Sequence, residues 1–366
     1  MGKYRIYVYA ICKNEAGFAA RWMASMAEAD GVYVLDTGST DGTAALLESL
    51  GAHVETASVT PWRFDTARNR SLEGLPEDAD LCVCTDLDEV FHPGWREHME
   101  HALEQGAERV RYRYTWNFLP DGSEGVVFWS DKAHSRHGWR WVNPVHEVLA
   151  WTGEGAPRTV SAEGVQLDHH ADRQKSRSQY LPLLELAVQE DPENDRNMHY
   201  LGREYMFHGM WEACEKTLLR HLALKSATWA DERCASMRFL ARAAIRQNRR
   251  QDAERWLLRA IGEAPWLREP WLEASQYAAE RGDWMGSLYF AQRALEIRER
   301  GKSYINEAES WGAKPYDLAA VAAYYAGLPD KALSYGTQAL EYAPQDGRLQ
   351  RNLEFYRSAC TPEAAQ

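Results

Sequence analysis

The stretch CVCTDLDEVFHP, Cys82–Pro93, places three acids directly after an apolar run. The run is typical of a buried strand, and Asp86, Asp88 and Glu89 follow it before Pro93 interrupts the pattern. Like charges this close repel one another, and a buried carboxylate without a partner is costly. We therefore expect a cation at the end of this strand, either a metal ion or a lysine, with exposure to water as the alternative.

Strand and helix signals alternate on both sides of this stretch. The β-rich runs are 5–11, 31–36 and 80–88, and helical patterns follow them at 16–29, 41–51 and 95–106. This order predicts an α/β domain with a mainly parallel sheet covered by helices. The run ERVRYRYTWNF at 108–118 alternates as a half-exposed antiparallel strand does. Parallel sheets bind ligands at the carboxyl ends of their strands, which is where the three acids are expected to lie.

From about residue 173 the strand signals end, and the rest of the chain predicts an all-α region with an internal repeat. Ala253 and Ser287 are 34 residues apart, as are Ala260 and Ala294. Ala339 follows Ala294 by 45 residues, which indicates an insertion near the segment GKSYINEAESW. A period of 34 with small residues at these points resembles the tetratricopeptide repeat (TPR).

The expected organisation is an α/β domain over 1–172, a connecting helix over 173–196 and a TPR-like helical domain over 197–366. The net charge of −12 disfavours sequence-independent binding to nucleic acid. No apolar run approaches the roughly 20 residues of a membrane span, and the first residues lack a secretory-signal pattern, so we expect a cytoplasmic protein. The six cysteines lack zinc-binding spacing, which favours buried, reduced thiols, and Cys82 and Cys84 should face one side of the sheet.

Four short motifs occur in order along the first domain. They are AICKNEAG at 10–17, VLDTGSTDGT at 34–43, FDTARNRS at 64–71 and TDLDE at 85–89. The G-x-G-x-x-G fingerprint of dinucleotide-binding proteins is absent. The ordered motifs resemble those of the family 2 glycosyltransferases, nucleotide-sugar enzymes with the Rossmann-like GT-A fold. The whole chain looks like the subset of that family that carries TPRs after the catalytic domain.

The resemblance implies a metal-dependent, inverting hexosyltransferase that uses a nucleotide-diphosphate sugar, most commonly a UDP-sugar. A divalent ion, Mn²⁺ or Mg²⁺, neutralises charge on the leaving diphosphate, and carboxylate oxygens suit both ions. Asp86 and Asp88 match the D-x-D motif of the family and are both expected at the metal site, with Asp88 on the metal and Asp86 on the ribose or on a metal-bound water. His169 matches a late histidine that binds the metal in some members, and His170 is the alternative.

The nucleotide-binding residues implied by this resemblance lie in the same motifs. Asp36 matches the acid that holds the nucleoside, and Arg68 matches the arginine of the A-R-N segment close to the nucleotide. A planar guanidinium suits bidentate contact with a base edge, a carboxylate or a phosphate. The full set is Ala10, Lys13, Asn14, Glu15, Asp36, Gly38, Ser39, Arg68, Asn69 and Asp86.

A general base has to take the proton from the acceptor as the new bond to the sugar forms. In related transferases a carboxylate follows the strand on the acceptor side, and here the segment PVHE ends in Glu147. Glu147 is therefore the candidate base, with His146 and Asp131 as alternatives. The nearby histidines are too loosely spaced, and too far from any cysteine, to favour a zinc site.

The motifs do not identify the molecule that accepts the sugar. A helical solenoid suits a peptide or protein acceptor, with a glycan as the second choice, and it could also join two copies of the chain. The acidic net charge disfavours a nucleic-acid acceptor. Two other functions remain as alternatives: a nucleotidyltransferase, and a TPR scaffold whose first domain has lost its activity.

Overall fold

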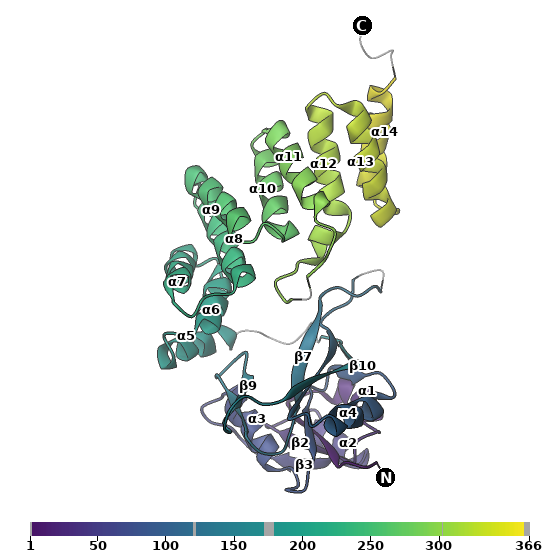
Figure 1. Ribbon diagram of the computed structural model, residues 1–366, viewed down its shortest axis with the longest axis vertical. Helices are drawn as coiled ribbons and strands as arrows, with labels where there is room; N and C mark the ends of the chain where they lie inside the picture. The colour runs from purple at the N-terminus through teal and green to yellow at the C-terminus, as the bar shows by residue number, and fades with distance from the viewer. Residues whose placement is uncertain (1, 120–121, 172–178, 302, 362–366) are drawn as a thin grey trace. The chain divides into compact units, whose positions relative to one another are not determined.

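The computed structural model describes residues 2–119, 122–171, 179–301 and 303–361 (Figure 1). The chain divides into two compact units, Met1–Glu190 and Asp191–Gln366. The first unit has mixed α/β structure and the second is helical. The expected boundary between residues 172 and 173 lies outside the described residues.

The first unit contains an eight-stranded sheet and a separate two-stranded hairpin. The strands are β1 (Ile6–Cys12), β2 (Gly31–Asp36), β3 (His53–Thr56), β4 (Leu81–Cys84), β5 (Glu89–Phe91), β6 (Arg109–Thr115), β7 (Val127–His134), β8 (Trp139–Val142), β9 (Val148–Trp151) and β10 (Thr159–His169). The helices are α1 (Ala16–Ser25), α2 (Thr43–Ser49), α3 (Phe64–Glu73), α4 (Trp95–Glu104) and α5 (Tyr180–Glu190).

The order of strands in the large sheet is β3-β2-β1-β4-β7-β6-β10-β5. Strands β3, β2, β1 and β4 run parallel, which was predicted for β1, β2 and β4, whereas β3 was not predicted. The other half of the sheet is mixed, because β7 is antiparallel to both β4 and β6 while β10 runs parallel to β6. The predicted antiparallel strand at 108–118 is confirmed as β6.

The strand expected at 80–88 is shorter in the structure. Strand β4 ends at Cys84, so Asp86 and Asp88 lie in the turn between β4 and β5, and Glu89 begins β5. The turn brings the chain into antiparallel pairing with β10, where Glu89 is opposite His169. The three acids therefore belong to a tight reversal and not to one continuous strand.

The two faces of the sheet have separate cores. Val8, Val83 and Leu81 pack with Trp22 of α1 and Trp95 of α4 on one face. On the other face, Tyr9, Cys82 and Cys84 pack with Leu72 of α3 and Trp141 of β8. This alternation follows from the two-residue period of a strand, and it confirms that both cysteines face one side.

The connecting helix expected over 173–196 is interrupted in the structure. Helix α5 ends at Glu190 and the next helix begins at Asp195. Pro192 lies between them, and a proline cannot continue the hydrogen-bond ladder of a helix. Helix α5 belongs to the first unit, where the ring of Tyr180 stacks on Phe64 with ring centroids 6.3 Å apart.

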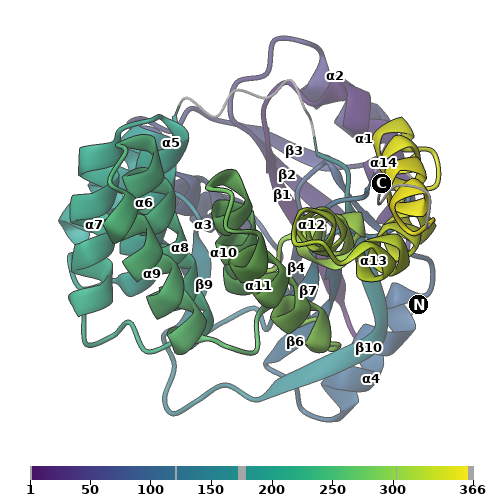
Figure 2. The same ribbon diagram turned by 90° about the horizontal axis from the view of Figure 1, so that it is seen from above.

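The second unit consists of TPR-like helix pairs. Its helices are α6 (Asp195–Phe207), α7 (Trp211–Ala223), α8 (Ala230–Arg246), α9 (Arg250–Glu263), α10 (Arg268–Glu280), α11 (Trp284–Glu296), the short 3₁₀ helix η1 (Ala308–Trp311), α12 (Ala313–Tyr325), α13 (Pro329–Tyr342) and α14 (Gly347–Ala359). Figure 2 shows successive helices packed side by side, α8 with α9, α10 with α11, and α12 with α13.

The small residues of the 34-residue period lie where paired helices touch. Ala253, Ser287 and Ala332 occupy equivalent places on α9, α11 and α13, and all three are buried. Small side chains there let the helices approach closely. The expected insertion is confirmed as the segment between α11 and α12, which contains η1.

Among the described residues, no helix combines the length and the apolar composition that crossing a bilayer requires. All six cysteines are free thiols, and five of them are buried. Burial raises the pKa of Cys82 and of Cys214 to about 12, which keeps these thiols protonated and unreactive near neutral pH.

Candidate functional site

The predicted site residues gather at the carboxyl edge of the parallel strands. From β1 the chain first builds β2 and β3 on one side, and then returns to build β4 on the other side. A reversal of this kind leaves a crevice beyond the strand ends, where ligands of open α/β sheets bind. Cys12, Asp36 and Cys84 end the three strands that meet there.

Hydrogen bonds lock together the loops that follow β1 and β2. Oδ1 of Asn14 accepts from the backbone N–H of Thr40 at 2.7 Å, and Oγ of Ser39 accepts from the N–H of Asn14 at 2.8 Å. Oδ1 of Asp36 accepts from the N–H groups of Gly38 and Ser39, both at 2.8 Å. Burial raises the pKa of Asp36, but the hydrogen bonds from Ser39 and Gly38 outweigh it and lower the pKa below its ordinary value.

The other residues predicted on these two loops differ in exposure. Ala10 lies in the core of β1, where its carbonyl accepts from the hydroxyl of Ser71 at 2.8 Å, and Glu15 is also buried. Lys13 and Gly38 are exposed. Lys13 is thus a cation on this edge that a soluble anion can reach.

Glu89 is the most deeply buried of the three acids, with 1% of its surface exposed. Its carboxylate accepts from the hydroxyl of Tyr114 at 2.8 Å, from Nζ of Lys132 at 3.1 Å and from the N–H of Asp86 at 2.9 Å. Burial raises the pKa of Glu89, and Lys132 opposes that rise. Glu89 therefore ties the turn to strands β6 and β7.

Asp86 lies between two cations. Its Oδ1 accepts from Nη2 of Arg68 at 2.8 Å, and its Oδ2 accepts from Nζ of Lys132 at 3.3 Å. The cation expected beside these acids is thus supplied in part by Lys132, which the sequence analysis did not identify. It is 46 residues from Asp86 in the chain, and no local pattern marks it.

Arg68 is 5% exposed and connects Asp86 to Glu147. Its Nε donates to Oε1 of Glu147, its Nη1 donates to Sγ of Cys84 at 3.2 Å, and its guanidinium lies 5.2 Å from the ring centre of Trp141. Burial lowers the pKa of Arg68, but Asp86 and Glu147 outweigh this effect and hold the pKa well above its ordinary value. Arg68 is therefore a fixed positive charge beneath the site.

Asp88 of this turn forms a second pair with His169, which ends β10. Oδ2 of Asp88 lies 3.3 Å from Nε2 of His169, and Nδ1 of His169 is hydrogen bonded to the carbonyl of Trp116 at 2.8 Å. The partly exposed ring of Trp116 covers the imidazole, with centroids 4.6 Å apart. Burial lowers the pKa of His169, but the contact with Asp88 reverses this and raises the pKa above its ordinary value.

His170, the alternative to His169, has a different environment. Its backbone N–H donates to the backbone carbonyl of Asp88 at 2.8 Å, while its ring stacks on Phe118 with centroids 5.5 Å apart. Burial lowers the pKa of His170. The structure thus brings the ring of His169, and not that of His170, to the carboxylate of Asp88.

Three other predicted residues have contacts of their own. The side-chain amide of Asn69 bonds both to the N–H and to the carbonyl of Trp141, each at 2.9 Å, and so anchors β8. Asp131 is exposed and pairs with Arg109 at 3.0 Å, although it is adjacent to Lys132 on β7. His146 has a positive φ of 51°, and its ring stacks on Tyr180 with centroids 5.7 Å apart.

A shallow hollow of the first unit, lined by Asp80, Glu108 and Arg136 among others, lies at the opposite edge of the sheet, at the amino ends of β4 and β6. None of the candidate residues lines it. The candidate residues Asp36, Asp86 and Asp88 instead lie at the carboxyl edge of the sheet, which is where open α/β sheets bind ligands.

No protein-family model matches the chain. Among solved structures it is similar to MamA, with 19% identity, a TM-score of 0.37, and coverage of 46% of this chain and 89% of that chain. It is also similar to pilF of Pseudomonas aeruginosa (14% identity, TM-score 0.37, 48% and 72% covered). A third is TTC0263, a thermophilic TPR protein of Thermus thermophilus (20% identity, TM-score 0.33, 49% and 88% covered). At these identities and scores the likeness extends to neither activity nor partners.

Proposed function

We propose that the chain is a metal-dependent glycosyltransferase that moves a sugar from a nucleotide-diphosphate donor, with a UDP-sugar as the first choice. The observation that carries the proposal is the pairing of Asp88 with Nε2 of His169 at the carboxyl edge of the parallel strands. The order β3-β2-β1-β4 supports it, since the reversal beside β1 is the position at which such sheets bind nucleotides.

The two interlocked loops suit the nucleoside part of the donor. Asp36 is buried and its carboxylate holds the amides of Gly38 and Ser39, so it fixes the loop that follows β2. Asn14 fastens this loop to the one after β1. A loop held this firmly is preorganised, which lowers the entropy cost of binding. In this proposal the exposed Lys13 supplies positive charge for the diphosphate.

Asp88 and His169 fit a divalent cation. A histidine that ligates a metal through one nitrogen commonly donates from the other to a backbone carbonyl, and His169 has this arrangement with the carbonyl of Trp116. One carboxylate and one imidazole suit Mn²⁺, and Mg²⁺ is the alternative. Two protein ligands leave positions for phosphate oxygens, as is usual for such ions. When bound, the ion would neutralise charge on the departing nucleoside diphosphate.

Asp86 has a different part in this proposal. Both of its oxygens already accept from cations, Arg68 on one side and Lys132 on the other. It therefore holds the turn and offers a polar surface to the ribose or to a water, while the direct metal contacts belong to Asp88 and His169. The network keeps the turn rigid, because each buried charge has an opposite partner.

Glu147 remains the candidate general base. Its Oε1 accepts from Arg68, and no described residue donates a hydrogen bond to its Oε2. That second oxygen is the one that could take a proton from an acceptor hydroxyl. Asp131 is less well placed, because it is exposed and paired with Arg109. An inverting reaction needs one such base and no covalent intermediate.

The helical unit suits recognition of a peptide or protein acceptor, or pairing of two copies of the chain, with a glycan acceptor as the second choice. Large apolar side chains of its helices are exposed, and they are available for contact with another protein. They are Phe207, Met210, Leu219, Trp229, Leu258, Trp266, Met285, Tyr289, Tyr325, Tyr342 and Phe355. A nucleic-acid acceptor is disfavoured by the net charge of −12.

The test is a panel of nucleotide sugars with and without Mn²⁺, with release of nucleoside diphosphate as the readout. We expect metal-dependent release from one donor class even without an acceptor, since water can replace it. A parallel arm supplies nucleoside triphosphates with a sugar 1-phosphate, and release of pyrophosphate in that arm would instead indicate a nucleotidyltransferase. Failure of every nucleoside diphosphate to bind in the presence of Mn²⁺ or Mg²⁺ would overturn the proposal and favour an inactive TPR scaffold.

A further inference from the structure

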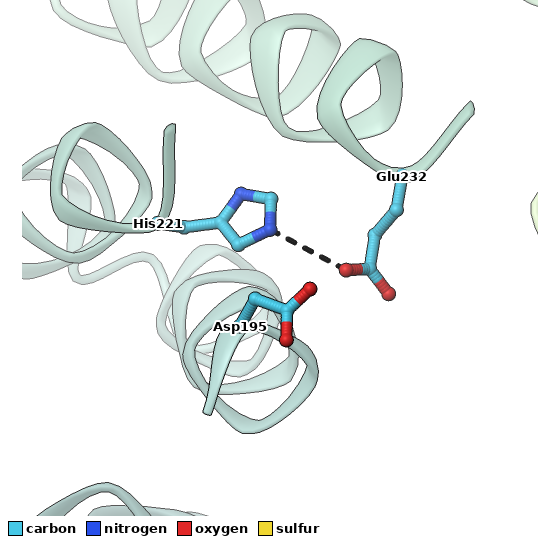
Figure 3. A group of neighbouring side chains, drawn as sticks. All are labelled: Asp195, His221 and Glu232. Atoms are coloured by element: carbon cyan, nitrogen blue, oxygen red, sulfur yellow. Dashed lines mark ion pairs between the residues drawn. The ribbon is translucent and has the colours of Figure 1, made fainter. Parts of the chain in front are cut away.

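Three potential metal ligands converge where the first helices of the second unit meet. Asp195 of α6, His221 of α7 and Glu232 of α8 each direct a ligand atom to a common point, and these atoms lie within 4.8 Å of one another (Figure 3). His221 is fully buried and Glu232 is 3% exposed, whereas Asp195 is half-buried. The three residues come from separate helices, so only the packing of the solenoid brings them together.

Nε2 of His221 is a buried nitrogen with no hydrogen-bond partner among the described residues. It lies 3.3 Å from Oε1 of Glu232 and points toward it (Figure 3). The other ring nitrogen, Nδ1, lies 3.0 Å from the hydroxyl of Ser236. A buried polar atom of this kind usually requires an explanation, such as an ion or a water.

The hydroxyl of Ser236 restricts which ring nitrogens of His221 and His199 can carry a proton. It lies between Nδ1 of His221 at 3.0 Å and Nδ1 of His199 at 2.7 Å, and it has one proton to donate. When Ser236 donates to His199, it must accept from Nδ1–H of His221. Nε2 of His221 then presents its lone pair to the carboxylate of Glu232. In this tautomer two lone pairs face each other at 3.3 Å, an arrangement that a bound metal ion stabilises, whereas in the opposite tautomer Nε2–H of His221 donates to Glu232.

The second oxygen of Glu232 is also held in place. Tyr304, in the insertion between α11 and α12, donates its hydroxyl to Oε2 of Glu232. This bond turns Oε1 toward His221. Hydrogen bonds to the far side of a histidine and of a carboxylate are the outer contacts that orient ligands in metal sites, and Ser236 and Tyr304 supply one of each.

We propose that Asp195, His221 and Glu232 form a binding site for a divalent transition metal of the Zn²⁺ type. One imidazole nitrogen and two carboxylate oxygens are ordinary zinc ligands, at distances of roughly 2.1 Å from the ion. Such ligands around a tetrahedral ion lie roughly 3.4 Å apart, close to the 3.3 Å between His221 and Glu232. Asp195 supplies the third protein ligand, and a water takes the fourth position on the half-exposed side of the site, next to Asp195. The site joins α6, α7 and α8, and it is independent of the glycosyltransferase proposal.

The experiment measures uptake of Zn²⁺ by the full-length chain against a chromogenic chelator. The chain carries Asp88→Asn, so that the candidate metal site of the first unit is not counted. We expect one equivalent of Zn²⁺, a rise in melting temperature on binding, and a visible spectrum typical of tetrahedral coordination when Co²⁺ replaces Zn²⁺. Adding Asp195→Asn should weaken the affinity at least tenfold. Asp195 is half-buried, so this variant keeps the core intact.

Glu193→Gln is the matched control, because it removes one negative charge from an exposed side chain two residues from Asp195. It should leave the affinity for Zn²⁺ unchanged. Circular dichroism confirms that both variants are folded. The proposal is wrong if the Asp88→Asn chain takes up no Zn²⁺, or if Asp195→Asn and Glu193→Gln bind it equally. The contact between His221 and Glu232 would then be an ion pair only.

Discussion

Replacing Asp88 with asparagine tests the metal-binding pair of the first unit. Asparagine keeps the size of the side chain and one acceptor oxygen, but it removes the negative charge that faces His169 at 3.3 Å. If the pair holds the cation that the leaving diphosphate requires, metal-supported transfer should fall on the order of a thousandfold, which corresponds to roughly 4 kcal/mol of transition-state stabilisation.

The same substitution should have a smaller, pH-dependent effect on stability. A hydrogen bond that involves a charged group contributes roughly 1.5–3 kcal/mol, and the long contact of Asp88 with His169 suggests the lower end, about 1.5 kcal/mol. For a unit of this size that lowers the melting temperature by roughly 3–6 °C. Both side chains are nearly buried, so solvent screening takes away little of this energy.

The pH dependence has a definite sign. The pair raises the pKa of His169 in the folded protein, so its stabilisation is fully present below the ordinary pKa of histidine, about 6.5. It is lost as the pH rises through the higher pKa of the folded state. The deficit of Asp88→Asn relative to the wild type should therefore be fully present at pH 6 and should be smaller at pH 9.

The assay combines turnover with melting temperature at pH 6 and pH 9, each without ligand and with Mn²⁺ plus UDP. Glu55→Gln is the control, since it removes an exposed acid of β3 that pairs with Arg70 and belongs to no candidate site. We expect the control to keep its turnover and its ligand-dependent rise in melting temperature. If Asp88→Asn keeps its turnover within tenfold, or if its deficit in stability is equal at both pH values, the interpretation of this pair fails.

Three further substitutions separate structural from catalytic parts. Lys132→Met should lower the free energy of unfolding, measured by urea titration, by about 3–5 kcal/mol, because it leaves Glu89 buried without its cation. Adding Glu89→Gln to this variant should recover much of the lost stability. Glu147→Gln should lower kcat by roughly 10²–10⁴-fold while nucleotide affinity stays level, as expected for a general base; a change in affinity alone would indicate that Glu147 only positions Arg68. Asn69→Ala should cost about 2 kcal/mol of stability, because it removes both hydrogen bonds to Trp141. Its nucleotide affinity, measured by calorimetry, should stay unchanged. A large loss of affinity would instead indicate that Asn69 contacts the nucleotide.

The acidic turn shows which features of the site could be predicted from neighbouring residues in the sequence. Three acids in close succession need either a nearby cation or exposure to water, and this follows from electrostatics alone. The family resemblance named Arg68 and His169 for this site, but no pattern in the chain identified Lys132, which lies on β7. Its place beside the acids depends on strand pairing between distant segments, which local patterns do not encode.

The sequence by itself determined the elements whose causes are local. The apolar runs predicted β1, β2 and β4, and the 34-residue spacing of Ala253 and Ser287 predicted the helix pairs of the second unit. Periodicity is a property of neighbouring residues, since it records which side of a strand or helix is buried. Pro192 is also a local signal that ends a helix, but the helix expected over 173–196 ran through it, so this signal was overlooked.

Only the tertiary structure decided which charged groups meet. The acids lie in and after a turn that leads into β5, which pairs with β10. The side chain of Asn69 bonds to the backbone of β8, and Asp131 forms an ion pair with Arg109. The tertiary structure also brought His221 and Glu232 together from different helices. Contacts of this kind depend on the register and packing of whole elements, and a register shift of one residue would direct the side chains of a strand to the opposite face.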